Sequence, residues 1–86
     1  MPTISRFFGI LIRMYYNDHE PPHFHASYAD DEVQIEIETL LVLRGELPRR
    51  ALALVLEWAS IHRIELRENW VLARQGLPLH PIPPLE

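Results

Sequence analysis

Three of the chain's five histidines stand close together in the sequence, at positions His19, His23 and His25. Asp18 and Glu20 lie among them, so one short segment carries both imidazole and carboxylate groups. Imidazole changes its charge near neutral pH and is the commonest protein ligand for metal ions. The sequence therefore concentrates its candidate chemistry in this histidine segment.

Metal binding is the first chemistry that the segment can support. His23 and His25 are two residues apart, so on a β-strand both side chains project from the same face. Three neutral imidazoles, or two of them with the carboxylate of Asp18 or Glu36, could complete a site for a divalent metal such as zinc. The predicted metal ligands are His19, His23 and His25.

Acid–base catalysis without a metal is the second chemistry that the histidine segment can support. One of two histidines can act as the base and the other as the acid, while an arginine stabilises developing charge on a phosphate. Cleavage of RNA through its 2′-hydroxyl needs these roles and no cofactor. The catalytic candidates are His23, His25, Asp18 and Arg13, with Arg44 as a second arginine. The sequence leaves open whether the protein is an enzyme, and RNase-like chemistry is the first reaction that it suggests.

A structural role is the third alternative. Histidines can order a loop by hydrogen bonding to backbone groups, and a polar face bordered by aromatic rings can dock a partner or a second copy. His62 fits this class, because its helical spacing from Trp58 and Leu66 places it at the edge of the core.

Composition limits the classes of protein and partner. A chain of 86 residues gives room for one domain with a modest core. Absence of cysteine excludes disulfides and cysteine zinc sites, and it fits a reducing cytoplasm, where we expect the protein to be located. A formal net charge of -4 argues against a general DNA-binding surface, although a local RNA site remains open. The apolar runs are too short to cross a bilayer.

Strand-like patterns fill the first half of the chain, roughly residues 5–44. Residues 7–16 are rich in β-branched and aromatic side chains on both faces, which predicts an inner strand. Residues 23–28 and 33–38 alternate apolar and polar side chains, which predicts a hairpin. Residues 40–43 would supply a fourth strand. The polar face of the hairpin would carry His23, His25, Gln34 and Glu36.

Helical spacing follows over roughly residues 48–75, from Pro48 to a stop at Gly76. A single rod of this length would be about 42 Å long, which is long beside so small a domain. We therefore predict a break between Ser60 and Glu65. The proline-rich residues 77–86 should form an extended tail.

These patterns predict an α+β fold in one domain of residues 1–86. A three- to four-stranded, mostly antiparallel sheet comes first, and two helices then pack on one of its faces. The opposite face should carry His23 and His25 and be free for a ligand or partner. The predicted core consists of Phe8, Ile10, Ile12, Phe24, Val33, Ile35, Val55, Trp58 and Trp70.

Several motifs of the chain resemble the prokaryotic domain of unknown function 4160. They are Met1–Ile4, Asn17–Ala26, Leu47–Ala51, Glu57-Trp58 and Asn69-Trp70, and the likeness covers essentially the whole chain. The family's signature positions correspond to His19, Pro22, His23, Phe24 and His25. The resemblance implies a small stand-alone cytoplasmic protein whose gene lies beside that of a second small protein, as in toxin–antitoxin pairs. It implies no reaction.

The sequence and the resemblance together predict a toxin–antitoxin-like component. It would act through a small protein partner or on RNA, with the histidine segment as its working surface. A divalent-metal-binding module and a non-catalytic interaction or dimerisation domain are the alternatives.

Overall fold

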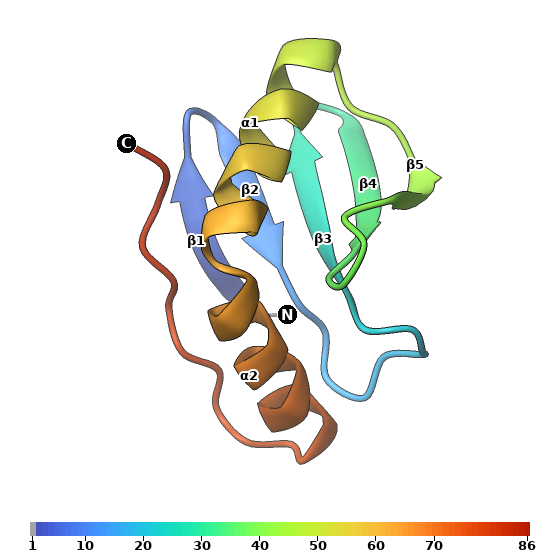
Figure 1. Cartoon of the computed structure of the whole chain (residues 1–86), viewed down its shortest axis with the longest axis vertical. Helices are drawn as coiled ribbons and strands as arrows, with labels where there is room; N and C mark the ends of the chain where they lie inside the picture. The colour runs from blue at the N-terminus through green and yellow to red at the C-terminus, as the bar shows by residue number, and fades with distance from the viewer. Residues whose placement is uncertain (1) are drawn as a thin grey trace.

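The computed structural model describes residues 2–86, and Met1, the first residue of the N-terminal family-like motif, lies outside them. Five strands come first in the chain and two helices follow (Figure 1). The strands are β1 (Thr3–Phe7), β2 (Ile10–Arg13), β3 (His23–Tyr28), β4 (Asp31–Glu36) and β5 (Val42–Gly45), and the helices are α1 (Arg49–Ile61) and α2 (Arg63–Arg74). The predicted α+β fold is confirmed.

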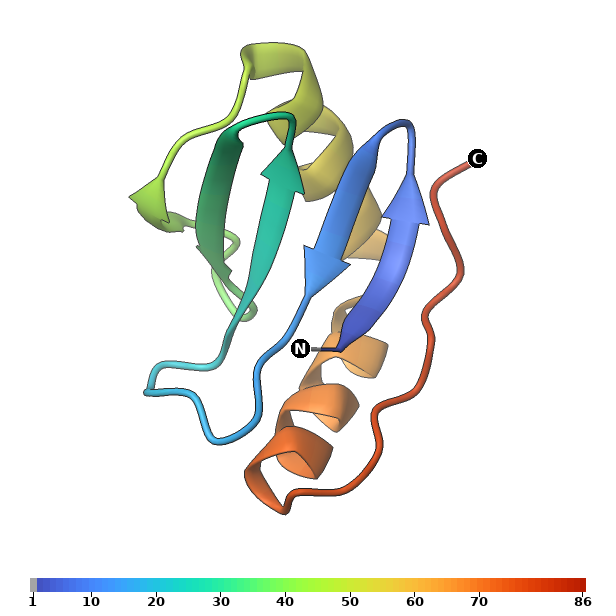
Figure 2. The ribbon, with the colours of Figure 1, turned by 180° about the vertical axis from the view of Figure 1, so that it is seen from behind.

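The strands form one antiparallel sheet in the order β1-β2-β3-β4-β5, so each strand pairs with its neighbour in the chain. Both helices lie on one face of this sheet, and Figure 2 shows the other face in front of them. The predicted packing of the helices on one face is confirmed. The sheet has one strand more than the upper limit of the predicted count.

The additional strand exists because residues 7–16 do not form a single strand. The chain reverses at Phe8 and Gly9, whose φ angles are 50° and 79°, and Phe7 then pairs with Ile10. Glycine adopts a positive φ without steric cost, which allows this tight turn. The residues predicted to form one inner strand thus belong to two strands, the end of the edge strand β1 and the inner strand β2. Phe8 at the tip of the turn is 60% exposed, so its predicted place in the core is wrong.

The core lies between the sheet and the helices. Trp58 of α1 packs its indole against the Phe24 ring of β3, with 5.9 Å between ring centroids. Replacing a buried aromatic of this kind by alanine typically costs about 3–5 kcal/mol. All predicted core residues except Phe8 are buried: Ile10, Ile12, Phe24, Val33, Ile35, Val55, Trp58 and Trp70.

The predicted helix break is confirmed. Helix α1 ends at Ile61 and α2 begins at Arg63, with His62 between them at a φ of -110° and a ψ of 26°. Leu66 in α2 is fully buried, so the second helix also contributes to the core. Neither helix of the described chain is long and apolar enough to cross a membrane.

The segment that follows α2 has no helix or strand and runs beside β1 (Figures 1 and 2). The backbone N–H of Ile82 donates to a carbonyl of β1 at 2.8 Å. The indole N–H of Trp58 donates to the carbonyl of Pro83 at 2.9 Å, and Asn69 makes two hydrogen bonds with the backbone of His80. The tail therefore covers one edge of the sheet, and β5 forms the other edge.

Candidate metal centre

Strand β3 carries two histidines on the sheet face that points away from the helices. His23 lies opposite Glu36 of β4 in the antiparallel register, and His25 lies opposite Gln34. Phe24, between the two histidines, points the other way into the core, because successive side chains of a strand alternate. The predicted polar face of this hairpin is therefore confirmed.

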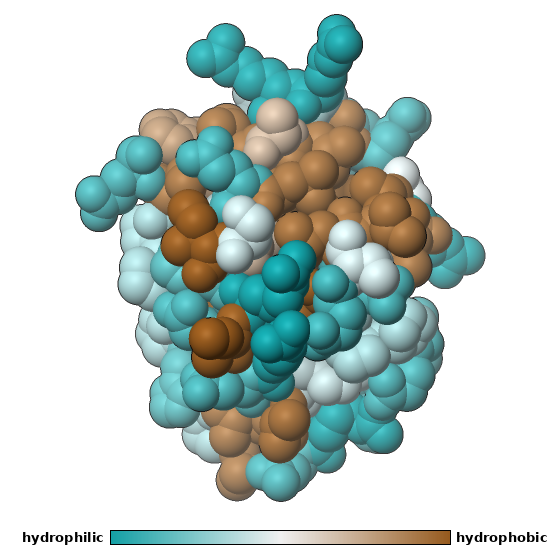
Figure 3. All heavy atoms as spheres, in the orientation of Figure 1, coloured by the Kyte–Doolittle hydropathy of each residue, from teal (hydrophilic) through white to brown (hydrophobic). Residues whose placement is uncertain are grey.

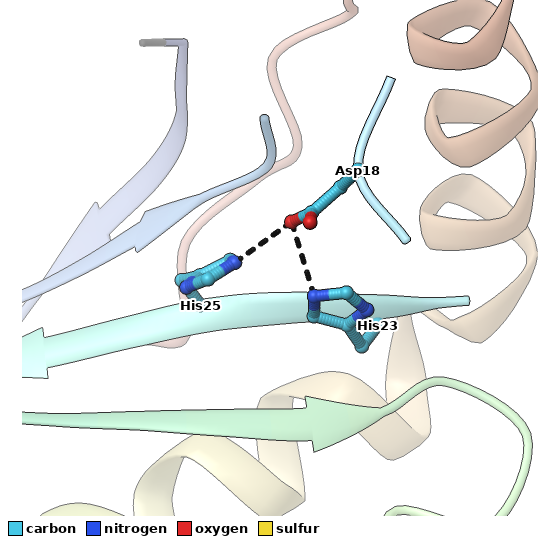
Figure 4. A group of neighbouring side chains, drawn as sticks. All are labelled: Asp18, His23 and His25. Atoms are coloured by element: carbon cyan, nitrogen blue, oxygen red, sulfur yellow. Dashed lines mark hydrogen bonds and ion pairs between the residues drawn. The ribbon is translucent and has the colours of Figure 1, made fainter. Parts of the chain in front are cut away.

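The loop between β2 and β3 turns back over the start of β3 and is attached to α2 at two points. The backbone N–H of Asn17 donates to the carbonyl of Ala73 at 3.3 Å. The side chain of Glu20 accepts a hydrogen bond from Arg74. These contacts hold Asp18 above the strand, with its carboxylate toward the histidine rings (Figure 4).

The ligand atoms of three side chains converge at this point. Oδ2 of Asp18 lies 3.1 Å from Nε2 of His23 and 3.1 Å from Nε2 of His25 (Figure 4). All three ligand atoms lie within 4.8 Å of one another. A tetrahedral zinc ion with bonds of about 2.0–2.1 Å separates its ligand atoms by roughly 3.3 Å. The spacing of the three side chains therefore suits a shared metal ion.

Hydrogen bonds at the other ring nitrogen, Nδ1, orient the rings of both histidines. Nδ1 of His23 lies 2.8 Å from the carbonyl oxygen of Pro21, and Nδ1 of His25 lies 3.0 Å from Oε2 of Glu32. A carbonyl or carboxylate oxygen can only accept, so each Nδ1 carries a proton. Nε2 of His23 has no hydrogen-bond partner in the described part of the chain, whereas Nε2 of His25 lies at hydrogen-bond distance, 3.1 Å, from Oδ2 of Asp18. Histidines that ligate metals show this arrangement, because the Nδ1 hydrogen bond orients the ring and raises its basicity.

Nε2 of His23 is a buried nitrogen without a hydrogen-bond partner among residues 2–86. Asp18 Oδ2 is only 3.1 Å away, but it does not meet hydrogen-bond geometry with this nitrogen. When a carboxylate oxygen and an imidazole nitrogen bind the same metal ion with bonds of about 2.0–2.1 Å, the oxygen lies roughly 40° away from the lone-pair direction of the nitrogen. Poor hydrogen-bond geometry is therefore expected between two ligands of one ion. A buried polar atom without a partner is costly, and a cation between the two groups would remove that cost.

The electrostatics of the cluster keep Asp18 ionised. Partial burial raises the pKa of this carboxyl, but hydrogen bonds from His25 and from the backbone N–H of His19 act in the opposite direction. Positive charge on His23 and His25 adds to their effect, so the pKa of Asp18 lies below its ordinary value. The carboxylate is therefore available as an anionic ligand at neutral pH.

Comparison with known families now adds to this geometry. The model of a family described as a domain of unknown function (DUF4160) matches residues 9–71. This chain belongs to the DUF4160 family. The matched region contains Asp18, His23 and His25, and the predicted resemblance is confirmed. No curated protein and no solved structure gave a significant match.

The DUF4160 site is more enclosed than the sequence suggested. The side chain of His23 has no solvent exposure, and His25 is 8% exposed as a residue. Tyr15 packs edge-on against His25 with 4.4 Å between centroids, and Trp70 of α2 lies 5.4 Å from the His23 ring. The prediction of a freely accessible histidine face is wrong, because the β2–β3 loop covers it and Trp70 of α2 packs against the buried His23 ring.

The other candidate residues of this DUF4160 chain lie near the cluster or outside it. Arg13 lies opposite His25 in the register of β2 and β3, and both lie beside Tyr15. Among residues 2–86, no carboxylate lies within 4.0 Å of the Arg13 guanidinium. Glu36 accepts a hydrogen bond from a neighbouring threonine, and Arg44 is exposed on β5. Neither residue belongs to the three-ligand cluster.

His19 lies beside the cluster and is not one of its three converging ligands. Its ring stacks on that of His23 with 4.9 Å between centroids, and its side chain is 66% exposed. Its Nε2 atom is 3.7 Å from Oδ1 of Asp18. The structure therefore brings all three predicted metal ligands into one neighbourhood, with Asp18 at the centre.

Two groups that orient the rings were missed at the sequence level. Glu32 lies opposite Ser27 in the β3–β4 hairpin, which places its carboxylate next to His25. The hairpin register could have revealed this contact. The carbonyl of Pro21 has no side-chain signal, so sequence reasoning could not assign its role.

Proposed function

We propose that this DUF4160 protein is a divalent-metal-binding module whose ligands are Asp18 Oδ2 and the Nε2 atoms of His23 and His25. One observation carries the proposal: two imidazole Nε2 atoms and a carboxylate oxygen converge, with 3.1 Å from the oxygen to each nitrogen. The Nδ1 hydrogen bonds to Pro21 and Glu32 support it, because they orient both rings with Nε2 toward Asp18.

Protonation is the other way to satisfy these nitrogens. Two protonated rings would place two positive charges in imidazoles whose centroids are 5.1 Å apart, and one of these rings is fully buried. Burial disfavours a charged group, and like charges at this distance repel. A single divalent ion satisfies all three ligand atoms and leaves Asp18 as its counter-charge, so the geometry favours the metal.

The donor set limits the metal. Two imidazoles and one carboxylate suit Zn²⁺, and the same set occurs in iron(II) sites with open positions. A site with three protein ligands leaves room for a water molecule or another donor. The class of metal is therefore a borderline transition ion rather than Ca²⁺ or Mg²⁺, which prefer oxygen ligands.

Metal titration of the purified full chain tests the proposal. After treatment with a chelator and dialysis, the protein should bind one equivalent of Zn²⁺ per chain, measured by calorimetry and elemental analysis. His25→Gln should weaken binding at least about 100-fold, because it removes a ligand nitrogen. His80→Gln, a change at a distant exposed side chain, should bind as tightly as wild type. Absence of stoichiometric binding by the folded wild type would refute the proposal.

A toxin–antitoxin-like role is the second candidate. A metal ion held by Asp18, His23 and His25 would supply an activated water for hydrolysis of RNA, and Arg13 beside His25 would stabilise the phosphate. Exposed apolar side chains of the β5 region offer a contact for a partner: Leu41, Val42 and Leu43. Figure 3 also shows hydrophobic surface, in brown, across the upper part of the helix-bearing face.

Expression in bacteria tests this second candidate. We expect the wild-type protein to inhibit growth, and Asp18→Asn to remove the inhibition while the protein accumulates to the same level. Equal growth with both proteins would count against a toxic activity of this site. Metal binding in vitro would be unaffected by that outcome, so the two candidates can be separated.

A further inference from the structure

His19 contacts the cluster of Asp18, His23 and His25 through both its backbone and its ring. The backbone N–H of His19 donates to Oδ1 of Asp18 at 2.9 Å. Its ring stacks on the His23 ring at an interplanar angle of 27°. The side chain is held next to the ligands on the side of the cluster that remains open to solvent.

The ring of His19 has the same polarity as the two ligating rings. Its Nδ1 atom lies 3.2 Å from the carbonyl oxygen of Glu20, so Nδ1 carries the proton and Nε2 is bare. This bare Nε2 faces Oδ1 of Asp18 at 3.7 Å. All three histidines of the segment thus place Nε2 within 3.7 Å of one carboxylate.

We propose that His19 is the fourth ligand of the metal ion, which completes a site of three imidazoles and one carboxylate. The proposal rests on the proposed function. The side chain can make the necessary rotation, because it is 66% exposed and its ring contact is with another ligand rather than with the core. His19 is not among the residues whose ligand atoms lie within 4.8 Å of one another, so this rotation must bring its Nε2 toward the ion that the other three ligands hold.

The fourth ligand determines the kind of site. Four protein ligands give the closed tetrahedral geometry of zinc sites that hold structure, whereas three leave a position for water or substrate. His19 is the most exposed of the four side chains, so it is the ligand that an external donor can displace. It therefore closes the site at rest and opens it when a competing donor arrives.

Cobalt substitution of the full-length protein tests His19 directly. Tetrahedral Co²⁺ gives strong visible absorption bands, and a change in ligand set or coordination number alters their intensity and position. We expect strong bands for wild type. His19→Ala retains the backbone N–H that anchors Asp18, and it should weaken Co²⁺ binding at least about tenfold and change the spectrum. Free imidazole should restore the wild-type spectrum to this variant, and His80→Ala should match wild type throughout.

The outcomes separate this inference from the proposed function. If folded wild type binds no Co²⁺, the metal site itself is wrong. If wild type and His19→Ala bind with equal affinity and give equal spectra, the three-ligand site stands and the role of His19 is wrong. Loss of affinity with a changed spectrum, restored by imidazole, supports both.

Discussion

Histidine meets carboxylate in two regions of this protein. At the junction of the two helices, Nδ1 of His62 lies 3.0 Å from Oε1 of Glu65, and the His62 ring packs 5.6 Å from the centroid of Trp58. In the other region, His23 and His25 of β3 converge on Asp18. The residue types are the same in both regions, but the groups around the second ring nitrogen of each histidine differ.

The helix junction is a self-contained pair. Glu65 is three residues after His62 and stands in the first turn of α2, where a negative charge also interacts favourably with the helix dipole. Near the start of β3, each ring has one acceptor at Nδ1 and meets Asp18 through Nε2. A histidine becomes a candidate metal ligand when its second ring nitrogen lies close to other groups that can also bind a metal ion. Counting histidine–carboxylate pairs alone would therefore not separate the two regions.

The largest expected effect separates the two regions by metal affinity. Asp18→Asn removes the charge that both Nε2 atoms share, and we expect at least about a 100-fold loss of Zn²⁺ affinity. His62→Gln should leave the affinity unchanged. Competition with a zinc-binding dye measures both variants. Equal losses in the two would mean that the regions do not differ as described.

A smaller effect is expected from the residue that orients His25. Glu32→Gln removes the negative charge at Nδ1, and such changes typically weaken metal binding about 10- to 100-fold. The same dye competition gives the affinity, and chelator-treated protein should retain its circular dichroism. An affinity within twofold of wild type would show that Glu32 does not contribute to the site.

The pH dependence of the metal-free protein should also depend on Asp18. Because the pKa of Asp18 is lowered by folding, the unfolded chain takes up a proton at higher pH than the folded protein does. The contribution of Asp18 to the free energy of unfolding is complete at pH values above its ordinary pKa of 3.8. It is lost as the pH falls through the lowered pKa of the folded protein. Urea unfolding in chelator at several pH values should show a steeper acid loss for wild type than for Asp18→Asn. Parallel curves would contradict the lowered pKa.

The smallest effect belongs to the helix junction. Glu65→Gln breaks a partly exposed pair within one segment, and it should lower the free energy of unfolding by at most about 1 kcal/mol. Metal affinity should not change. Thermal unfolding with and without Zn²⁺ checks both statements, and a loss of the zinc-dependent stabilisation would link the two regions unexpectedly.

The sequence predicted much of this fold because its patterns are local. Period-two alternation placed His23 and His25 on one face, and the length of the helical segment predicted a break between Ser60 and Glu65, which the structure has at His62. The turn at Phe8 and Gly9 was missed, because apolar residues on both sides of a single glycine resemble a continuous buried strand. Such a turn depends on backbone conformation at two residues, which hydrophobic pattern does not report.

The site was predicted in its residues and missed in its enclosure. Asp18 stood among the candidates, but its central position depends on the path of the β2–β3 loop and its attachment to α2 at Ala73. The cover over the rings comes from Tyr15 and Trp70, which are distant from each other in sequence. Contacts between distant segments have no signature in a single sequence.

The contact between Trp70 and the buried imidazole of His23 gives the protein an optical reporter of its own. If His23 binds zinc as we propose, the change in charge at its ring should alter the fluorescence of the adjacent indole, so that zinc loading would be followed without a label. Trp58 lies apart from the cluster, with its N–H bonded to Pro83, and provides an internal reference. Replacing Trp58 by phenylalanine would leave Trp70 as the single emitter for this measurement.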